Sequence, residues 1–388
     1  MNKDILHKEY QDFIFSYKGV SSKLAFSGSP FKNISTQELL QQIESRRKIE
    51  KKLPSWYSMP SIYYPPKVNL EQTSSEITAK YKASLIQGAS LADLTGGFGV
   101  DSYYFSKRIA LVHHYETNES LSKISEHNFK TLGATNIDCV PSDGVSEIKD
   151  SYFDILYLDP SRRHDQKGKV FYLTDCEPNI PKHLDYLCKR CDYLLIKSSP
   201  MLDLTVGMTE LKYVAEIHIV AVNNDVKEVL WLLKAGVSEN PMIKTINFTN
   251  SGKETFDFLW NIAMPPVYGF PKQFLYEPNA AIMKSGGFHV LSTILNVEKL
   301  HINSHLYTSD KPIDFPGRRF VIEKVVPYTK KDMKAALCFS VANIATRNFP
   351  ESVALLRKKW KLSDGGANYL FFTTIGDNEK VMLVCKKV

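Results

Sequence analysis

A glycine-rich turn carries the strongest chemical signal in this sequence of 388 residues. The apolar run 91–94 predicts a strand, and a helix is expected to begin directly after the turn. The turn contains Thr95, Gly96, Gly97 and Gly99. Glycines let a ligand approach the backbone closely, and a helix start offers unpaired N–H groups. Asp93 precedes the glycines, and its carboxylate would repel a dinucleotide phosphate but suit a cationic amino group. The turn therefore favours S-adenosylmethionine over nicotinamide or flavin cofactors.

Two further acids follow the next two predicted strands. Glu116 comes directly after the run 111–115, and Asp143 comes shortly after the run 137–140. At the carboxyl end of its strand, Glu116 could accept hydrogen bonds from both ribose hydroxyls, and Asp143 could accept one from the adenine amino group. Each acid alone resembles an ordinary surface residue. Their occurrence together, after successive strands, predicts one cofactor site.

A polar loop follows the fourth predicted strand, 155–158, and reads Asp159, Pro160, Ser161, Arg162 and Arg163. It resembles the D-P-P-Y motif of amino-methylating enzymes, whose polar groups hold the acceptor amine in line with the methylsulfonium. The sequence departs from that motif because no aromatic residue follows that could stack on a base, which argues against methylation of an exocyclic amine. The two arginines could instead bind a substrate phosphate or pair with a carboxylate inside the protein.

The same loop also resembles the D-P-P-R motif of enzymes that methylate pyrimidine carbon through a cysteine nucleophile. Those enzymes need a thiolate near the end of the next strand, whereas here the strand 193–196 is followed by Lys197, Ser198 and Ser199. Serine is a poor nucleophile without an activating base, so this route is disfavoured. Lys197 is then expected at the rim of the site, where its charge could meet a phosphate or an internal acid.

A polar segment precedes the first predicted strand. One hypothesis places Gln72 and Thr73 against the carboxylate of the methionine moiety. The alternative is a helix start that is capped by a Ser or Thr side chain.

The order of apolar and amphipathic segments predicts the fold around these residues. Strands near 91–94, 111–115, 137–140, 155–158 and 193–196 alternate with helices, for example 120–132 and 181–189, and such alternation produces a parallel sheet. Two later strands, 215–222 and 228–233, are joined only by 223–227, which is too short for a crossover. They must pair antiparallel, as a terminal hairpin.

The N-terminal 65 residues are expected to be helical, with one clear helix that starts at the capping box Ser35 to Glu38 and stops before Pro54. The prolines between 56 and 66 predict an extended linker.

Composition restricts the class of protein. Hydrophobic residues make up 43% and charged residues 23%, which is typical of a globular chain long enough for two or three domains. No segment has the apolar length of a membrane span, and the polar start does not resemble a signal peptide, so a cytoplasmic location without membrane contact is expected. Cys188 and Cys191 form one CxxC without a second pair, so we expect no metal and predict that both pack where a helix meets a strand.

Positive charge is concentrated near the C-terminus. Residues 316–388 contain 14 Lys and Arg against 6 Asp and Glu, a net charge of +8, whereas the whole chain carries +7. Such a segment suits a polyanion. The candidates for phosphate contact are Arg318, Arg319, Lys330, Lys331, Lys334, Arg347, Arg357, Lys358, Lys359 and Lys361, with Tyr328 and Trp360 as possible base-stacking partners. The alternative is a solvated basic surface over buried aromatic side chains.

Several motifs together make the sequence resemble the class I S-adenosylmethionine-dependent methyltransferases with a C-terminal THUMP-like domain. The motifs are the segments 93–99, 159–163, 197–203, 276–279, 315–318 and 347–350. The resemblance implies an α/β fold with a Rossmann-like seven-stranded sheet and terminal hairpin over 66–236, after the helical segment 1–65. It also implies a small ferredoxin-like α+β unit over 237–315 and a THUMP-like basic domain over 316–388.

By analogy with THUMP domains, the resemblance implies RNA, either tRNA or rRNA, as the partner. An RNA methyltransferase is therefore the leading hypothesis. One alternative is a methyltransferase of a small molecule or protein, whose C-terminal units form a lid or a dimer contact. Another is a non-catalytic RNA-binding protein that retains the cofactor fold.

Overall fold

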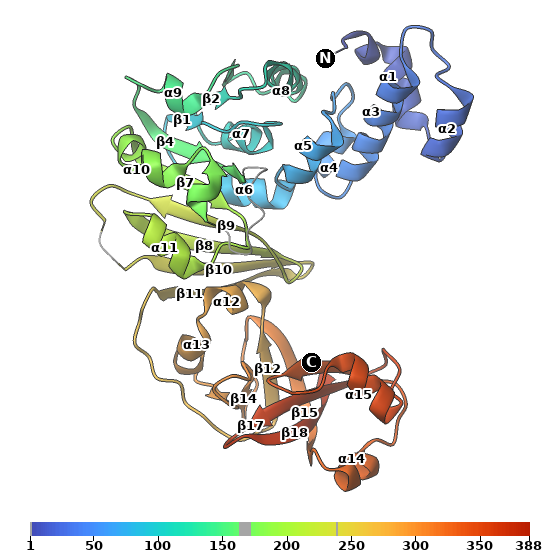
Figure 1. Ribbon diagram of the computed structural model, residues 1–388, viewed down its shortest axis with the longest axis vertical. Coiled ribbons are helices and arrows are strands. Elements are labelled where there is room, and N and C mark those ends of the chain that lie inside the picture. Colours follow the sequence, from blue (N-terminus) through green and yellow to red (C-terminus); the bar gives the residue numbers. More distant parts are fainter. Residues whose placement is uncertain (1, 163–171, 238–239) are drawn as a thin grey trace. The chain divides into compact units, whose positions relative to one another are not determined.

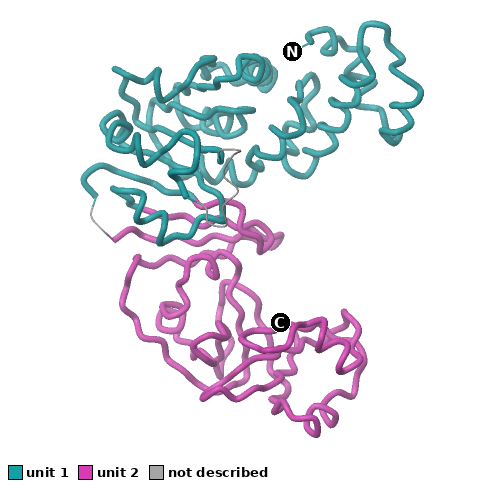
Figure 2. The backbone as a smooth tube through the Cα atoms, viewed as in Figure 1, with its two compact units in different colours: residues 1–215, 230–239 teal, residues 216–229, 240–388 magenta. Residues whose placement is uncertain are grey.

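The computed structural model describes residues 2–162, 172–237 and 240–388. The chain forms two compact units, shown in Figure 2. The first contains residues 1–215 and 230–239, and the second contains residues 216–229 and 240–388. Each unit is described by itself below, with the element labels of Figure 1.

The first unit contains the parallel strands that the sequence predicts. They are β1 (Ser90–Asp93), β2 (Leu111–Tyr115), β3 (Ile137–Val140), β4 (Phe153–Leu158) and β7 (Cys191–Ser198). β1 pairs parallel with β2 and β4, β2 with β3, and β4 with β7. The helices between these strands are α7 (Val100–Phe105), α8 (Glu119–Thr131), α9 (Gly144–Glu147), α10 (Ile180–Cys188) and α11 (Leu204–Glu210), and Figure 1 shows this alternation. The predicted helices 120–132 and 181–189 are confirmed to within one residue at each end.

The predicted hairpin is present but tighter than expected. β8 (Val214–Val222) and β9 (Asp225–Leu233) are separated only by Asn223 and Asn224, which have φ of 51° and 63°. Two successive residues with positive φ, here both asparagine, are the pattern of a type I′ turn, whose twist matches that of paired strands. The predicted turn 223–227 was therefore wrong in length, because residues 225–227 already belong to β9.

Two further strands extend the sheet beyond the hairpin. Within the described residues the strand order is β11-β10-β8-β9-β7-β4-β1-β2-β3, which contains the seven predicted strands. The added strands are β10 (Met242–Thr249), parallel to β8, and β11 (Gly252–Leu259), antiparallel to β10. The α/β fold class with a Rossmann-like sheet is confirmed, and the two edge strands are an addition that the sequence did not predict.

Helices precede the sheet. They are η1 (Asp4–Leu6), α1 (Lys8–Ser16), α2 (Ser21–Ser27), α3 (Thr36–Ile49), α4 (Pro54–Ser58), α5 (Lys67–Gln72) and α6 (Glu76–Ser84). The predicted capping box is confirmed, since Ser35 and Glu38 exchange both hydrogen bonds at the start of α3. The predicted linker 56–66 was wrong at its start, because Pro54 occupies a first-turn position, where its missing N–H costs nothing, and a short helix forms there. Asn128 of α8 exchanges two 2.9 Å hydrogen bonds with the backbone of Tyr63 and so fixes the segment that follows.

The second unit contains a second sheet. Its strands are β12 (Phe274–Pro278), β13 (Glu298–Lys299), β14 (Tyr307–Ser309), β15 (Gly317–Pro327), β16 (Asn343–Arg347), β17 (Asn368–Ile375) and β18 (Glu379–Lys387). The order over residues 240–388 is β13-β14-β12-β15-β18-β17-β16. The accompanying helices are α12 (Ala280–Ser285), α13 (Phe288–Ile294), α14 (Lys330–Ala336) and α15 (Val353–Trp360). The sheet is continuous across residue 316, and β10 and β11 lie in the other sheet, so the domain boundaries at 65, 236 and 315 stay predictions.

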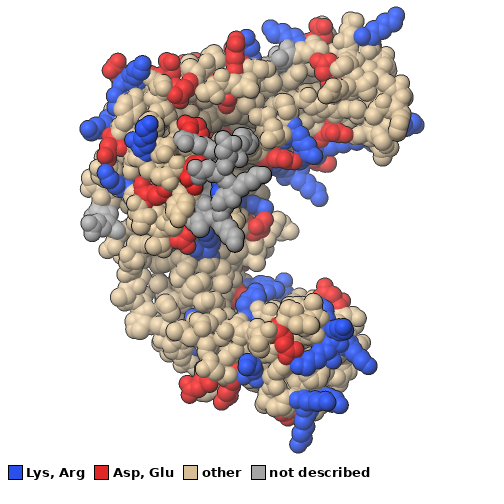
Figure 3. All heavy atoms as spheres, in the orientation of Figure 1, with Lys and Arg blue, Asp and Glu red and all other residues tan. Residues whose placement is uncertain are grey.

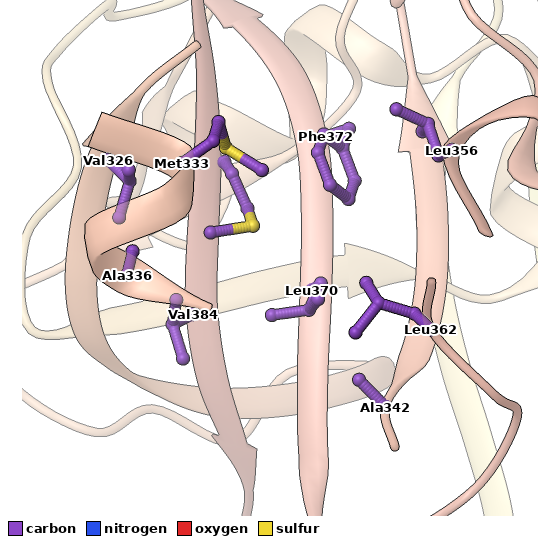
Figure 4. Packing of buried hydrophobic residues seen from close by; sticks show 10 residues of the cluster. Val326, Met333, Ala336, Ala342, Leu356, Leu362, Leu370, Phe372 and Val384 are labelled. Carbon is purple, nitrogen blue, oxygen red and sulfur yellow. The ribbon is translucent and has the colours of Figure 1, made fainter. Parts of the chain in front are cut away.

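Both faces of this second sheet bury apolar side chains. On one face Leu370 and Phe372 pack against Met333 of α14 and Leu356 of α15, as Figure 4 shows. On the other face Phe371 joins a cluster with Leu275, Phe320 and Leu383. Neighbouring residues of β17 belong to different clusters because side chains alternate across a strand.

The positions of the CxxC cysteines, of possible metal ligands and of long apolar helices were compared with the sequence analysis. Cys188 ends α10 and Cys191 begins β7, which confirms their predicted position where a helix meets a strand. Among the described residues, no three His, Cys, Asp or Glu side chains are grouped as a metal site would need. No helix in residues 2–162, 172–237 or 240–388 has the length and apolar character that a membrane span requires.

Candidate cofactor and acceptor site

The backbone of the glycine turn is anchored to both neighbouring strands. Leu94 N donates to the carbonyl oxygen of Tyr157 at 3.0 Å, and Gly96 N donates to that of Tyr115 at 2.7 Å. Gly97 has φ of 56°, and the nearest atom that a Cβ on it would meet is 3.8 Å away. Its N–H donates to Glu116 Oε2 at 2.9 Å. Gly97 is therefore the glycine of the turn that borders open space.

The other two glycines are required by packing inside the protein. A Cβ on Gly96 would overlap the imidazole of His114, and a Cβ on Gly99 would overlap the ring of Phe129. His114 is fully buried on β2, and burial lowers the pKa of its imidazole to about 4. A neutral ring therefore supports the turn from beneath, and glycine is the residue that fits over it.

Asp93 lies at the end of β1 and is buried. Its Oδ1 accepts from Thr95 N at 3.1 Å, and its Oδ2 accepts from Ser102 Oγ at 2.6 Å. Burial, together with the nearby charges of Asp101 and Asp159, raises the pKa of Asp93 to about 7. Asp93 thus holds the turn against α7, and its contact with a cationic amino group stays a prediction.

The two other predicted acids also lie at the carboxyl ends of their strands. Glu116 Oε1 accepts from Asn118 N at 2.7 Å, while its Oε2 accepts from Gly97 N. Asp143 caps α9, accepting from Val145 N at 3.2 Å and from Ser146 Oγ at 2.6 Å. The adjacent Gly144 packs on β1 and β2, since a Cβ there would lie 2.8 Å from Leu94 Cα and 2.9 Å from Tyr115 Cβ. The ends of β1, β2 and β3 therefore meet around the turn, as the sequence predicts.

A buried polar network beneath the site was missed by the sequence analysis. Lys82 on α6 is 0% exposed, lies 3.3 Å from Asp101 Oδ1 and donates to Ser74 Oγ at 3.0 Å. Asp101 Oδ2 accepts from Ser74 Oγ at 2.8 Å and from the Tyr157 hydroxyl at 2.9 Å. Although burial raises it, the charges of Lys82 and Lys197 bring the pKa of Asp101 below its usual value.

This network fixes the segment that was predicted to bind the methionine carboxylate. Gln72 is the last residue of α5, Thr73 follows it, and Ser74 joins the network directly after them. The role of Gln72 and Thr73 toward the carboxylate stays a prediction.

The loop after β4 is bonded to the glycine turn. Asp159 N donates to Thr95 Oγ1 at 2.7 Å, and the Asp159 carboxylate forms an ion pair with Lys197 at the end of β7. Of the two alternatives for Lys197, the structure therefore shows the internal acid. Pro160 is buried, and Ser161 and Arg162 form β5 (Ser161–Arg162), which pairs with β6 (Cys176–Glu177). Arg163 lies outside the described residues.

The basic residues of 316–388 fall into two groups. Some are ion-paired within the unit: Arg318 and Arg347 with Glu277, Arg319 with Asp314, and Lys359 with Glu351. Others are exposed: Lys330 and Lys331 at the start of α14, and Lys358 on α15. On the face shown in Figure 3, Lys and Arg side chains gather over α14 and α15. The paired group was predicted only as phosphate contacts, because its acidic partners could not be identified from sequence.

The two aromatic candidates for base stacking pack within the protein. Tyr328 and Trp360 are half-buried against the cluster of Figure 4, with ring centroids 6.2 Å apart and nearly perpendicular planes. The Tyr328 hydroxyl donates to Glu351 Oε1 at 2.7 Å. Of the two alternatives for these rings, the structure favours packed aromatic side chains.

The edge of the first sheet fits an S-adenosylmethionine cofactor. Gly97 presents backbone to open space, Glu116 and Asp143 lie at successive strand ends, and Asp93 and Asp159 add acidic character. Acids at adjacent strand ends suit the hydroxyls and amino groups of a nucleoside.

One solved structure is similar to this protein over the whole chain, and two family models match its C-terminal part. The structure is similar to one from Porphyromonas gingivalis W83 described as a putative methyltransferase, with 30% identity and a TM-score of 0.88 over 100% of this chain and 99% of that one. Residues 274–316 match a ferredoxin-like domain family, and residues 317–387 match a family described as THUMP domain-like.

Two other solved structures are similar to part of the chain. An rRNA methylase from Streptococcus thermophilus is 15% identical, with a TM-score of 0.30 over 41% of this chain and 93% of that one. A Streptococcus mutans protein in complex with SAH is 11% identical, with a TM-score of 0.31 over 41% and 96%. No curated protein matches the sequence significantly.

Proposed function

Because the chain belongs to the family of class I S-adenosylmethionine-dependent methyltransferases with a C-terminal THUMP-like domain, we propose that it methylates RNA, either tRNA or rRNA. The observation that carries the proposal is the hydrogen bond from Asp159 N to Thr95 Oγ1. It joins the loop expected to hold the acceptor to the turn expected to hold the cofactor, so the two reactants would meet at one edge of the sheet.

The residues at this edge have separate tasks in the proposed reaction. Gly97, Glu116 and Asp143 bind the nucleoside part of the cofactor, and Asp93 with Ser102 holds the turn in place. When bound, the cofactor supplies an electrophilic methyl group. The protein then contributes mainly by orientation, because a well-aligned methyl transfer gains most of its rate from proximity.

The Asp159–Lys197 pair positions the acceptor in this proposal. The Asp159 side chain is one-third exposed, so its carboxylate can accept a hydrogen bond from an N–H or O–H of the acceptor nucleotide. Lys197 fixes the direction of that carboxylate through the ion pair. Removing the Asp159 carboxylate should therefore reduce methyl transfer while leaving the sheet intact.

The RNA part of the proposal rests on the C-terminal segment. Its family match is THUMP domain-like, its net charge is +8, and Lys330, Lys331 and Lys358 are exposed. Contacts of this kind bind phosphates without reading sequence, and their affinity falls steeply as salt rises. A salt-insensitive affinity for RNA, or no affinity, would contradict this part of the proposal.

The decisive experiment is mass spectrometry of RNA nucleosides from a strain with and without the protein. We expect one methylated nucleoside to disappear in the deletion strain and to return with the wild-type chain but not with Asp159→Ala. Asp138→Ala is the matched control, since Asp138 is an exposed acid in the middle of β3. An unchanged set of nucleosides would instead favour a small-molecule or protein substrate.

A further inference from the structure

Three sequence motifs far apart in the chain converge on one buried carboxylate in the second unit. They are the segments 276–279, 315–318 and 347–350. Glu277 is 5% exposed and forms ion pairs with both Arg318 and Arg347. The backbone is tightly packed around it, because a Cβ on Gly317 would overlap the Glu277 carbonyl oxygen and lie 2.9 Å from Asn279 N. The motifs therefore build one site.

The two arginines reach Glu277 from different parts of the sheet. Arg318 lies directly opposite Glu277 in the pairing of β12 with β15. Arg347 ends β16, which is separated from β12 in the sheet by β15, β18 and β17. Adjacent strands lie about 4.8 Å apart, so a flat sheet would put Arg347 far beyond the reach of its side chain. The sheet must curve strongly to bring both guanidinium groups to one carboxylate.

The cluster carries more positive charge than its acid can balance. One carboxylate faces two guanidinium groups, which leaves one unit of excess charge. The Arg318 and Arg347 side chains remain 40% and 38% exposed, so each guanidinium is accessible on the side away from Glu277. A guanidinium has five N–H donors in a planar fork that matches phosphate oxygens. Glu277 thus orients the guanidinium groups of both Arg318 and Arg347.

A buried ammonium and a half-buried imidazole lie in the region of Arg347. Lys299 is fully buried, its ammonium donates to the carbonyl oxygen of Ile302, and burial lowers its pKa to about 8. The ring of His305 lies on Phe288 with centroids 3.7 Å apart. Burial and the positive charges of Lys299, His289 and Arg347 lower the pKa of His305 to about 4. An ammonium out of contact with water is costly unless an anion approaches it.

The loop that carries His305 is fixed beside Arg347 by hydrogen bonds. Asn348 Nδ2 donates to His301 Nδ1 at 3.0 Å, and Ser304 Oγ donates to the carbonyl oxygen of Thr374 at 2.6 Å. The loop and the end of β16 that carries Arg347 are therefore held together by the fold before any ligand arrives, which reduces the entropy that binding must overcome.

We propose that Arg318 and Arg347, oriented by Glu277, bind one phosphate group of the RNA substrate. Lys299 adds to the positive potential that draws the phosphate in, whereas the His305 ring, near Arg347, is neutral at pH 7. That the phosphate belongs to RNA rests on the proposed function; the phosphate site itself does not. This site is distinct from the exposed lysines of α14 and α15, because its donors are held rigidly by the protein.

The first test measures the binding of a fluorescent RNA oligonucleotide and of inorganic phosphate to the full chain. Arg347→Gln keeps Glu277 paired with Arg318 and should weaken both by about tenfold, the effect of losing one charge-assisted contact. Lys324→Gln is the matched control, because Lys324 is an exposed cation on β15 and its loss removes the same charge. The control should change either affinity by less than about twofold.

A second variant covers the case in which Arg347→Gln does not fold. Lys299→Met replaces a buried ammonium by an apolar chain of similar length, so thermal stability should be kept or raised while phosphate affinity falls severalfold. Equal losses of affinity in Arg347→Gln and Lys324→Gln, or unchanged phosphate affinity in Lys299→Met, would overturn the proposal.

The outcomes also separate this inference from the proposed function. If inorganic phosphate binds and Arg347→Gln weakens this binding, but RNA does not bind, the phosphate site is supported. The claim that the phosphate belongs to RNA is then overturned. If the methylated nucleoside returns fully in cells that carry Arg347→Gln, and phosphate does not bind the wild-type chain, the site is overturned while RNA methylation stands.

Discussion

The cofactor edge of the first sheet has an excess of acidic side chains, whereas the Glu277 cluster of the second unit has an excess of basic ones. Around the glycine turn, the described residues include three acids, Asp93, Asp101 and Asp159, and the ion pairs there are formed by Lys82 and Lys197. Around Glu277, one acid faces the two guanidinium groups of Arg318 and Arg347. A surplus of acid suits a cationic sulfonium nucleoside, and a surplus of base suits a phosphate. The comparison teaches that each region is charged as the complement of its proposed ligand.

The largest effect should come from breaking the buried ion pair at the acidic region. Lys82→Met leaves Asp101 charged and buried, so the free energy of unfolding should fall by about 3–5 kcal/mol. Urea unfolding followed by circular dichroism measures it. The double variant Lys82→Met/Asp101→Asn removes both charges and should recover most of the loss. Equal stability of the single and double variants would show that charge balance is unimportant there.

A smaller effect separates packing from ligand binding within the turn. Gly96→Ala forces a methyl group onto the His114 ring and should cost about 1–3 kcal/mol of stability. Gly97→Ala meets open space, so it should cost only about 1–2 kcal/mol, for its positive φ. Calorimetric titration with S-adenosylmethionine measures the affinity for the cofactor. Relative to the stability that each variant loses, Gly97→Ala should lose more of this affinity than Gly96→Ala. A greater relative loss of affinity in Gly96→Ala would contradict the proposal that the cofactor occupies the space beside Gly97.

The Asp159–Lys197 pair tests whether the acidic region acts on the acceptor. Lys197→Met should reduce the rate of methyl transfer by about tenfold, because the carboxylate loses its orientation, with little change in cofactor affinity. Lys212→Met is the control, since Lys212 pairs with Asp185 on an exposed surface. If Lys197→Met reduced cofactor affinity as much as the rate of methyl transfer, the Asp159–Lys197 pair would act on the cofactor and not on the acceptor.

A pH dependence of stability is expected from Asp93. The pKa of this carboxyl is raised from 3.8 to about 7 on folding, so the folded chain binds more protons than the unfolded chain between these values. Its contribution to stability is then greatest at low pH and is lost as pH rises toward 7, by at most about 1.4 kcal/mol per pH unit. The stability of Asp93→Asn relative to wild type should therefore increase between about pH 4 and 7. A difference that is constant with pH would show that Asp93 does not titrate in this range.

The sequence predicted the parallel strands because each is a short apolar run with a helical pattern beside it. The strands 111–115 and 137–140 were predicted with their observed ends. β10 and β11 were missed because residues such as Lys244, Asn247 and Glu254 interrupt their apolar pattern. They are strands through pairing with β8 and with each other, which is a tertiary effect.

The predicted site shows the same limit. Asp93, Glu116 and Asp143 could be found because each lies at or within three residues of the end of a predictable strand. The Lys82–Asp101 pair could not, because its two residues lie on different helices and each resembles a surface residue. The pairing of Arg347 with Glu277 could not be predicted either, since it depends on the curvature of a sheet.

His114 gives the cofactor turn a built-in spectroscopic reporter. Its ring packs against Gly96 and Gly99 of the turn. Its low pKa means that it stays neutral across the range in which methyl transfer would be assayed. The nitrogen resonances of this imidazole should therefore shift when the turn moves but not when the buffer pH changes, so that NMR of 15N-enriched protein can follow occupation of the site without an attached probe.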